Sequence, residues 1–386
     1  MRSVAILSAI LATGASVVSA VTTCTEEIKV SEPTPTIDCE VVDANIVVDE
    51  ALSGSLSLQG PKQLRKDLII RNATKLIGIS SSSINSVAGT LELTGLQLLS
   101  SFNMQSLTQV GNLKLQNLPQ LSGMTLGSEG VTKAKSIVIT DTFISDLSGL
   151  NIDQADTIDI SNNGKLTMFN SVLSNVTTFK LTNNGNNMQV NMSNLEFAKE
   201  IQFRQVKSFD APALNRVGSI KFNDSPELLS VSANNLTNID ASLTLINNKK
   251  LSELSFKSLV TIKGDLTVQN NTALEQIDGF PKVATVGAIL LRGNFKNVSM
   301  PRLNDVQGSA TASSTTDIST FCEFFDGLKK DGKIRGKESC TSNNKNANEG
   351  GSGGTSGNKQ EDAAGVISVN TALLGLAAFA AFAQLL

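Results

Sequence analysis

A short apolar motif recurs along most of the chain at nearly constant spacing. It consists of two apolar residues separated by one other residue, and its copies begin 19 to 24 residues apart. The eleven regular copies are Leu68/Ile70, Leu91/Leu93, Leu113/Leu115, Ile137/Ile139, Ile158/Ile160, Phe179/Leu181, Ile201/Phe203, Ile220/Phe222, Leu243/Leu245, Leu266/Val268 and Ile289/Leu291. An irregular pair, Leu56/Leu58, precedes them. A repeat of this length indicates stacked structural units rather than one globular core.

The rest of each unit repeats as well. If the first apolar residue is position i, further apolar residues follow at i+8, i+11, i+16 and i+19. The copy that begins at Leu243 continues with Leu251, Leu254, Leu259 and Ile262. The i/i+2 pair predicts a short strand with alternate residues facing inward, and the later positions predict two further segments that close a coil. One coil cannot bury its own apolar edge, whereas a stack of coils can.

We therefore predict an all-β fold, a right-handed β-helix or solenoid of about eleven coils over residues 56–310. A leucine-rich-repeat horseshoe with one helix per unit is the alternative that the spacing also allows. The segments after each strand are rich in Ser, Thr, Asn and Gly, and they lack a sustained 3.6-residue apolar stripe. This composition favours β coils.

Position i+4 is polar in most copies. It is Asn at 72, 117, 162, 183, 247 and 270, Asp at 141 and 224, and Gln at 205. We predict a ladder of stacked side chains that bond to neighbouring backbone groups at a turn. A row of ligand-binding amides is the functional alternative.

The first 20 residues have the features of a secretory signal peptide. Arg2 gives a positive start, residues 4–18 are apolar, and small residues precede a cleavage point after Ala20. An N-terminal membrane anchor is the alternative, but the apolar run is short for a bilayer about 30 Å thick.

The C-terminal segment predicts attachment of a glycosylphosphatidylinositol (GPI) lipid. Residues 372–386 form an apolar tail without a following Lys or Arg, and small residues and a spacer precede it. We predict Asp362 as the attachment residue, with Ser356 as the alternative, and removal of residues 363–386. Residues 341–362, rich in Ser, Gly and Asn, cannot form a core and predict a flexible stalk.

The four cysteines occur as two local pairs near the ends of the repeat region. Four cysteines allow three connectivities, and the separation favours Cys24 with Cys39 and Cys322 with Cys340. A metal site would need further ligands, and the chain contains no His. We predict two disulfides, one in an N-terminal cap of residues 21–55 and one in a C-terminal cap of residues 311–340. The sequence FCEFFDGLKKDGKI predicts a short amphipathic helix over the last coil.

Seven Asn-x-Ser/Thr sequons predict N-linked glycans on a secreted chain. We expect higher occupancy at Asn175, Asn191, Asn235 and Asn297, which lie between strands. Asn72 and Asn270 occupy the i+4 position, where an inward side chain would lower occupancy. Asn223 is followed closely by Pro226, which also disfavours transfer.

The ordered set of features resembles the fungal GPI-anchored cell-wall organisation proteins of the extracellular-mutant and sporulation-specific class. The resemblance rests on the leader, the two cysteine pairs, the stalk, the tail and copies such as SLTLINNKKLSELSFKSLVTIKGDLTVQNNTALEQIDGF. It implies an ectodomain similar to receptor L-domains and a role in cell-wall integrity. It also implies contact with the outer leaflet of the plasma membrane through the GPI lipid, and with wall glucan and mannoprotein.

The residues themselves favour a non-enzymatic protein. Without His, neither a His-activated nucleophile nor a His general base can form. A carboxylate pair for glycoside hydrolysis stays open in principle. Charged residues predicted on the outer strand face are Glu92, Asp159, Lys114, Lys180, Lys221, Arg71, Arg204 and Arg292. We predict no catalytic, metal or cofactor site among them.

Binding functions stay open as alternatives. The chain has neither Trp nor Tyr on which a sugar ring could stack, but a polar glycan site or a protein-binding face would not require them. The net charge of −3 gives no attraction to nucleic acid. The specific ligand is therefore open, and wall-glycan-remodelling enzyme is the third alternative.

Overall fold

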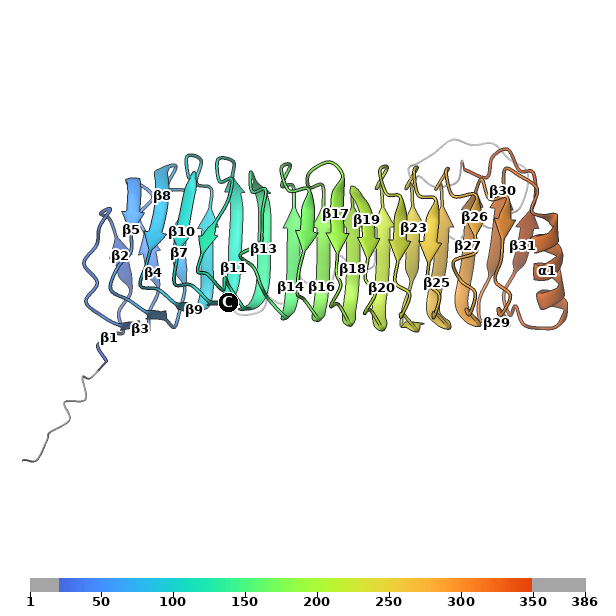
Figure 1. Ribbon diagram of the computed structural model, residues 1–386, viewed down its shortest axis with the longest axis horizontal. Helices are drawn as coiled ribbons and strands as arrows, with labels where there is room; N and C mark the ends of the chain where they lie inside the picture. Colours follow the sequence, from blue (N-terminus) through green and yellow to red (C-terminus); the bar gives the residue numbers. More distant parts are fainter. Residues whose placement is uncertain (1–20, 349–386) are drawn as a thin grey trace, which may run out of the picture. The chain divides into compact units, whose positions relative to one another are not determined.

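The computed structural model describes residues 21–348. The chain divides into two units, residues 1–351 and 352–386, and the described residues all belong to the first. They contain 31 strands and one helix, and the strands pair in parallel to form a β-solenoid (Figure 1). The predicted signal peptide, the GPI attachment residues Asp362 and Ser356, and the C-terminal tail lie outside the described residues.

One long parallel ladder carries the i/i+2 pairs. Its strands are β2 (Ile28–Val30), β4 (Ile46–Val48), β7 (Leu68–Arg71), β9 (Ser86–Thr94), β11 (Gln109–Leu118), β13 (Lys133–Thr142), β14 (Gln154–Ser161), β16 (Asn175–Thr182), β18 (Phe197–Arg204), β20 (Arg216–Asn223), β23 (Leu243–Ile246), β25 (Thr261–Gln269), β27 (Thr285–Gly293), β30 (Ala310–Ser314) and β31 (Glu338–Thr341). Each first apolar residue lies opposite the next, as Leu91 does with Leu113 and Leu113 with Ile137. The predicted solenoid and its register are confirmed.

The ladder extends beyond the eleven predicted copies in both directions. Ile28 pairs with Ile46 and Ile46 with Leu68 at one end, and Ile289 pairs with Ala310 at the other. The solenoid therefore has about 13 turns. The coil at Ile28 begins 18 residues before Ile46, outside the range of 19 to 24, and Ala310 and Ala312 are too small to stand out as an apolar pair. The Ile46/Val48 pair begins 22 residues before Leu68 and fits the repeat, but it lies in the segment that we predicted as an N-terminal cap.

Shorter strands continue the same sheet at the corner that precedes the central strands. They are β1 (Thr23–Cys24), β3 (Val41–Val42), β6 (Gln63–Leu64), β22 (Asn238–Ile239) and β29 (Asp305–Val306). In most other coils, one longer strand covers both the corner and the centre. Between the two parts, β11 shifts register against β9 at Val110/Asn112, which turns the chain at the corner.

A second wall of the solenoid carries the apolar residues near i+11. It is built from β5 (Ser53–Ser57), β8 (Lys75–Ser81), β10 (Ser101–Met104), β12 (Thr125–Leu126), β15 (Met168–Asn170), β17 (Met188–Asn191), β19 (Val206–Asp210), β21 (Ser230–Ser232), β24 (Glu253–Ser255), β26 (Gln276–Ile277) and β28 (Asn297–Val298). Leu56 pairs with Ile79 in this wall. The irregular Leu56/Leu58 pair is thus the second-wall segment of the coil that begins at Ile46, not the start of a coil.

Apolar side chains from both walls fill the interior. Phe rings of successive coils contact each other inside it: the ring centroids of Phe179 and Phe203 are 4.9 Å apart, and those of Phe203 and Phe222 are 5.5 Å apart. All three side chains are fully buried. Edge-to-face packing of this kind adds to the burial of apolar area.

The i+4 residues have one backbone conformation in coil after coil. Asn72, Asn117, Asp141, Asn162, Asn183, Gln205, Asp224, Asn247 and Asn270 all have φ between 52° and 61°. Gly95 occupies the same position with φ 72°. The chain therefore leaves each of these strands through a left-handed residue, a conformation that Asn, Asp and Gly tolerate best.

The buried amide ladder lies one residue later than we predicted, at i+5. Asn248 is fully buried; its Oδ1 accepts from the Ser225 backbone N–H at 3.0 Å, and its Nδ2 donates to the Phe222 carbonyl at 2.9 Å. Asn163 makes the equivalent contacts with Thr142 and Ile139. These bonds satisfy backbone groups that the left-handed turn removes from the strand ladder.

The i+4 side chains, by contrast, contact one another near the surface. The Nδ2 of Asn247 donates to Asp224 at 2.9 Å, and the Nδ2 of Asn270 donates to Asn247 at 3.2 Å. The expectation that i+4 side chains bond to backbone groups is therefore wrong for these coils. Strand alternation alone would turn i+4 inward, as it does i and i+2. The positive φ at i+4 breaks that alternation, and the i+5 residue takes the inward place.

Both predicted disulfides are present and lie toward the two ends of the solenoid. Cys24 is linked to Cys39, and Cys322 is linked to Cys340, with Cα atoms 5.8 and 5.3 Å apart. The predicted helix is α1 (Ser319–Lys330), which packs against β31 at the last rung (Figure 1). Its buried face consists of Phe321, Phe325 and Leu328.

We expect the Asn248→Ala variant to lose about 2–6 kcal/mol of unfolding free energy. The substitution leaves the Ser225 N–H and the Phe222 carbonyl buried without their partner, and each such loss costs about 1–3 kcal/mol. Asn247→Gly is the matched control, because Gly accepts the left-handed conformation and should cost less than about 1 kcal/mol. Urea unfolding measures both variants, and equal losses would contradict the assignment of the buried ladder to i+5.

Candidate functional site

The outer face of the long ladder presents the middle residue of each apolar pair. These residues form a row across the coils: Lys29, Val47, Ile69, Glu92, Lys114, Val138, Asp159, Lys180, Gln202, Lys221, Thr244, Thr267, Leu290, Thr311 and Ser339. The structure therefore brings Glu92, Lys114, Asp159, Lys180 and Lys221 onto one face, as predicted from the sequence.

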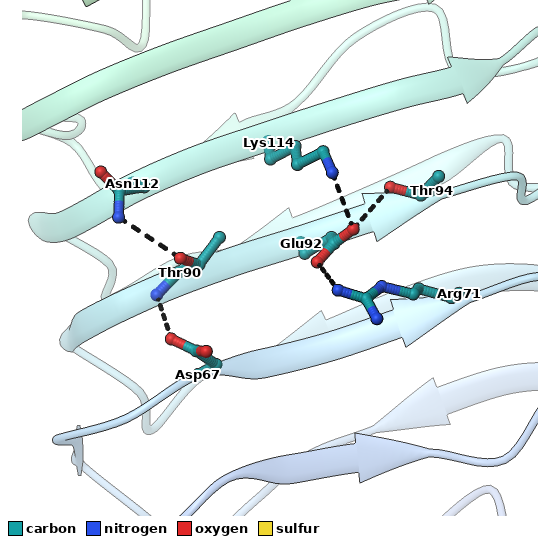
Figure 2. A network of polar contacts seen from close by, with 7 residues as sticks. All are labelled: Asp67, Arg71, Thr90, Glu92, Thr94, Asn112 and Lys114. Atoms are coloured by element: carbon teal, nitrogen blue, oxygen red, sulfur yellow. Dashed lines mark hydrogen bonds and ion pairs between the residues drawn. The ribbon is translucent and has the colours of Figure 1, made fainter. Parts of the chain in front are cut away.

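Glu92 is the most buried acid on this face. Its carboxylate accepts from the guanidinium of Arg71 at 2.5 Å and from the ammonium of Lys114 at 3.0 Å (Figure 2). The hydroxyl of Thr94 also donates to it at 3.2 Å. The Glu92 side chain is 7% exposed, whereas those of Arg71 and Lys114 are 55% and 37% exposed. The two cations therefore cover a carboxylate that they also neutralise.

These contacts change the acidity of Glu92. The hydrogen bond from Arg71 is the largest influence, and with the contacts to Lys114 it lowers the pKa of Glu92 to about 2, although burial alone would raise it. Glu92 is therefore ionised at any pH above about 3. Sequence reasoning placed Glu92 on the outer face but gave no sign of its burial, which depends on side chains from the two adjacent coils.

A second polar chain lies beside this cluster, where the strands begin. The carboxylate of Asp67 accepts from the backbone N–H of Thr90 at 2.7 Å, and the Thr90 hydroxyl accepts from the Asn112 amide at 3.3 Å (Figure 2). Each of these contacts joins two successive coils. They serve the stacking of the coils rather than opening a cavity.

Two other acids on the strand face, Asp159 and Glu200, are also paired across coils. Lys180 contacts Asp159 at 2.9 Å, and Lys221 contacts Glu200 at 3.5 Å. Arg204 contacts the i+4 residue Asp224 at 2.5 Å. Arg292, the remaining predicted charge, is half-buried and lies opposite Gln269 and Ser313.

Asp240, which the sequence did not single out, bridges two cations at the corner of the solenoid. Its carboxylate contacts Arg216 at 2.6 Å and Lys263 at 2.8 Å. The hydrogen bond from Arg216, followed by that from Lys263, lowers the pKa of Asp240. In the sequence, Asp240 is marked only by opposite charges about one coil before and after it. Many other surface charges have the same spacing, so the pattern does not identify this ion pair.

The surface of the solenoid has two grooves of note. One, of about 670 Å³, runs across four coils at the corner of β9, β11, β13 and β14; its polar lining includes Gln109, Lys133, Lys135 and Asp153. The other, of about 380 Å³, lies between β28 and the start of α1. Within residues 21–348, no three metal-ligating side chains come together. No helix in that range has the length and apolar character needed to cross a bilayer.

The sequons differ in exposure. Asn191, Asn235 and Asn297 are exposed, and Asn175 is half-buried. Asn72 is exposed as well, so the inward orientation that we expected for it is wrong, and the reason to expect low occupancy there no longer applies. Asn223 and Asn270 are half-buried, and the side-chain carbonyl oxygen of each is buried.

Comparison with known proteins identifies the family of this chain. The chain is 32% identical to Protein ecm33 of Aspergillus fumigatus over 78% of this chain and 75% of that protein. It is also 32% identical to a Cell surface GPI-anchored protein of Arthroderma benhamiae, over 78% of each chain. The chain belongs to the Ecm33 family.

A third member of the Ecm33 family has a similar match. Cell surface GPI-anchored protein ECM33 of Candida albicans is 31% identical over 77% of this chain and 72% of that protein. No family model matches the chain. No solved structure matches it either. Membership of the Ecm33 family places the protein at the fungal cell surface and cell wall and assigns it to cell-wall organisation.

We expect the Glu92→Gln variant of this Ecm33-family protein to have a lower free energy of unfolding than the wild-type protein at pH 7. The difference between the two proteins should shrink as the pH falls. Because the folded pKa is depressed from 4.5 to about 2, the ionised carboxylate stabilises the fold fully above about pH 4.5, by at most about 3 kcal/mol. That contribution disappears as the pH falls through 2. Urea unfolding of both proteins from pH 7 to pH 2.5 should show the gap closing.

The Asp159→Asn variant provides the control for that measurement. Its carboxylate is 25% exposed and contacts one lysine, so we expect a loss below about 1 kcal/mol. A pH-independent loss in Glu92→Gln would contradict the electrostatic explanation and indicate altered packing instead.

We expect glycan occupancy to follow the exposure of each sequon. Asn72, Asn191, Asn235 and Asn297 should be glycosylated in most molecules, and Asn175 less completely. Asn223 and Asn270 should be the least occupied, because transfer would have to draw a buried amide out to the surface. Site-resolved mass spectrometry of glycopeptides measures this order, and high occupancy at Asn270 would contradict it.

Proposed function

We propose that the protein organises the fungal cell wall as a non-catalytic, repetitive scaffold. A GPI lipid attached at Asp362, with Ser356 as the alternative, would hold it at the outer leaflet of the plasma membrane. The scaffold would then contact wall glucan and mannoprotein from the outer side. The names of the Ecm33-family relatives support the location, and the chemistry of the outer strand face supports the absence of a reaction centre.

The observation that carries this proposal is that Glu92 and Asp159, two acids on the strand face, form ion pairs with cations of adjacent coils. Glu92 has a pKa of about 2 and is held by Arg71 and Lys114. A general acid functions best when its pKa lies near the working pH, and Glu92 is several units away. Asp159 is likewise occupied by Lys180. These carboxylates stabilise the stack instead of exchanging protons with a substrate.

The spacing along the strand face gives a second argument. Glu92 and Asp159 are separated by three rungs of the ladder, with Lys114 and Val138 between them. At about 4.8 Å per rung, the two carboxylates are roughly 14 Å apart. Glycosidases place their two carboxyl groups about 5 to 9.5 Å apart. This pair therefore does not have the geometry for glycoside hydrolysis.

A ligand-binding role is the second candidate, and the corner groove favours it. This groove of about 670 Å³ crosses four coils and is lined by polar side chains such as Gln109 and Asp153. A groove across the coils suits an extended partner, such as a glycan chain or a protein segment. Because binding needs no reaction centre, this role is compatible with a scaffold.

Incubation of the purified protein with β-glucan, chitin and mannan oligosaccharides tests the scaffold proposal. We expect no turnover of any of them by the wild-type protein. In cells that lack the gene, Asp159→Asn and Glu200→Gln should restore resistance to wall-binding dyes, because neither carboxylate carries chemistry. Leu245→Asp should not restore it, because an unpaired charge in the core breaks the stack.

The opposite pattern would support an enzyme. Turnover of one oligosaccharide by the wild-type protein would overturn the proposal if a single carboxylate variant lowered the rate by a factor of about 100 or more. A loss of that size is expected when a catalytic acid or base is removed. Circular dichroism and cell-surface abundance of each variant distinguish loss of function from loss of fold.

A further inference from the structure

The groove beside α1 contains a sequon. Among the residues that line its volume of about 380 Å³ are Asn297, Ser299, Met300, Phe321 and Phe324. The first two belong to the Asn297-Val298-Ser299 sequon at β28, and the last two belong to α1. The groove therefore lies between the second wall of the solenoid and the start of α1, the helix at the C-terminal end of the solenoid.

The charged groups of the groove are already engaged. The ammonium of Lys296 contacts Glu275 at 2.7 Å. Asp317 accepts from the Ser319 backbone N–H and from the Ser342 hydroxyl, both at 2.9 Å. By contrast, Asn297 is exposed, and its side-chain amide makes no hydrogen bond to another residue within the range 21–348. Asn297 is thus a sequon asparagine in the groove whose amide is accessible for modification.

Phe324 gives the groove an apolar wall. Its ring is 6.0 Å from that of Phe321 and 6.5 Å from that of Phe325, centroid to centroid. Phe321 and Phe325 are buried, whereas Phe324 is half-buried. A partly exposed aromatic ring beside hydrogen-bonding groups is the arrangement on which a pyranose ring can pack with its C–H face.

We propose that Asn297 carries an N-linked glycan whose first N-acetylglucosamine lies in this groove against Phe324, so that the sugar forms part of the C-terminal cap. This inference rests on passage of the chain through the secretory pathway and is independent of whether the scaffold is catalytic. The groove is near the lower end of the range of small-ligand sites, about 300–1,000 Å³. It therefore has room for the base of a glycan and not for the whole branched structure.

The modification itself is a group transfer from a polyprenyl-diphosphate-linked oligosaccharide. A bond forms between the Nδ2 of Asn297 and C1 of the first sugar, and the bond from C1 to the diphosphate oxygen breaks. The diphosphate leaves with the electron pair, and Nδ2 loses one proton. The hydroxyl of Ser299 completes the sequon and remains unmodified.

The expected consequence is a more stable junction between α1 and the last coils. Ile318, the residue before the helix, has no capping side chain, and the Asp317 carboxylate accepts the Ser319 backbone N–H in the first turn. Packing of the apolar face of α1 against the last coil adds to this contact. A sugar that covers Phe324 would remove further apolar surface from water. We expect removal of this glycan to lower the melting temperature of the protein by about 2–4 °C.

A double-mutant cycle on the full-length, glycosylated protein tests the inference. The variants are Ser299→Ala, which removes the sequon and keeps Asn297, Phe324→Ser, and their combination. We expect Ser299→Ala to lower the melting temperature in the wild-type background and to have no effect in the Phe324→Ser background. Independent, additive shifts would overturn the proposal, as would glycopeptide mass spectrometry that finds Asn297 unmodified.

Asn191→Gln is the matched control. Asn191 is an exposed sequon on β17 whose neighbours in the second wall are Asn170 and Asp210, so its glycan should shift the melting temperature by less than about 1 °C and show no coupling to Phe324.

A second measurement avoids substitution altogether. An endoglycosidase that leaves the first N-acetylglucosamine on each site should preserve the melting temperature of the wild-type protein, because the sugar in the groove remains. A fall of the same size as that in Ser299→Ala would contradict the placement of the first sugar against Phe324.

Discussion

The fold depends on parallel backbone hydrogen bonds between each coil and its two neighbours. A coil of about 22 residues cannot bury its own apolar edge, so its stability comes from the coils on either side. This constraint explains why the i/i+2 pairs keep register from Ile28 to Ile289. It also explains why Phe179, Phe203 and Phe222 pack ring against ring between coils, and why both ends of the stack carry a disulfide.

The same constraint decides what the polar residues do. A left-handed residue at i+4 takes the chain out of the strand, and where i+5 is Asn its buried side chain bonds to the backbone groups left at that corner. On the outer face, Glu92 joins three coils through Arg71 and Lys114. These charges therefore stabilise the stack, which agrees with the scaffold role that we propose for this member of the Ecm33 family.

Much of this molecule could be predicted from one sequence. The period of the apolar pairs gave the solenoid and its register, since stacked coils require the same inward positions in each unit. The cysteine spacing gave both disulfides, and the FCEFF segment gave α1. The ladder could not be assigned to i+5 rather than i+4, because that choice depends on the sign of φ at i+4. The coils at Ile28 and Ala310 were missed because the spacing of the first and the side-chain size of the second depart from the pattern, whereas the regular Ile46/Val48 pair was assigned to the N-terminal cap.

The sequence by itself determined the repeat, the inward residues, the two disulfides and the family to which the chain belongs. It did so because periodicity, apolar burial and cysteine pairing are properties of short stretches of chain. Only the tertiary structure decided that Glu92 is buried between two cations and that Asn72 faces solvent. The tertiary structure also brought Asn297 and Phe324 to one groove. Each of these features depends on residues from different coils. The sequence could not reveal them, because the surroundings of a side chain are set only when the coils stack.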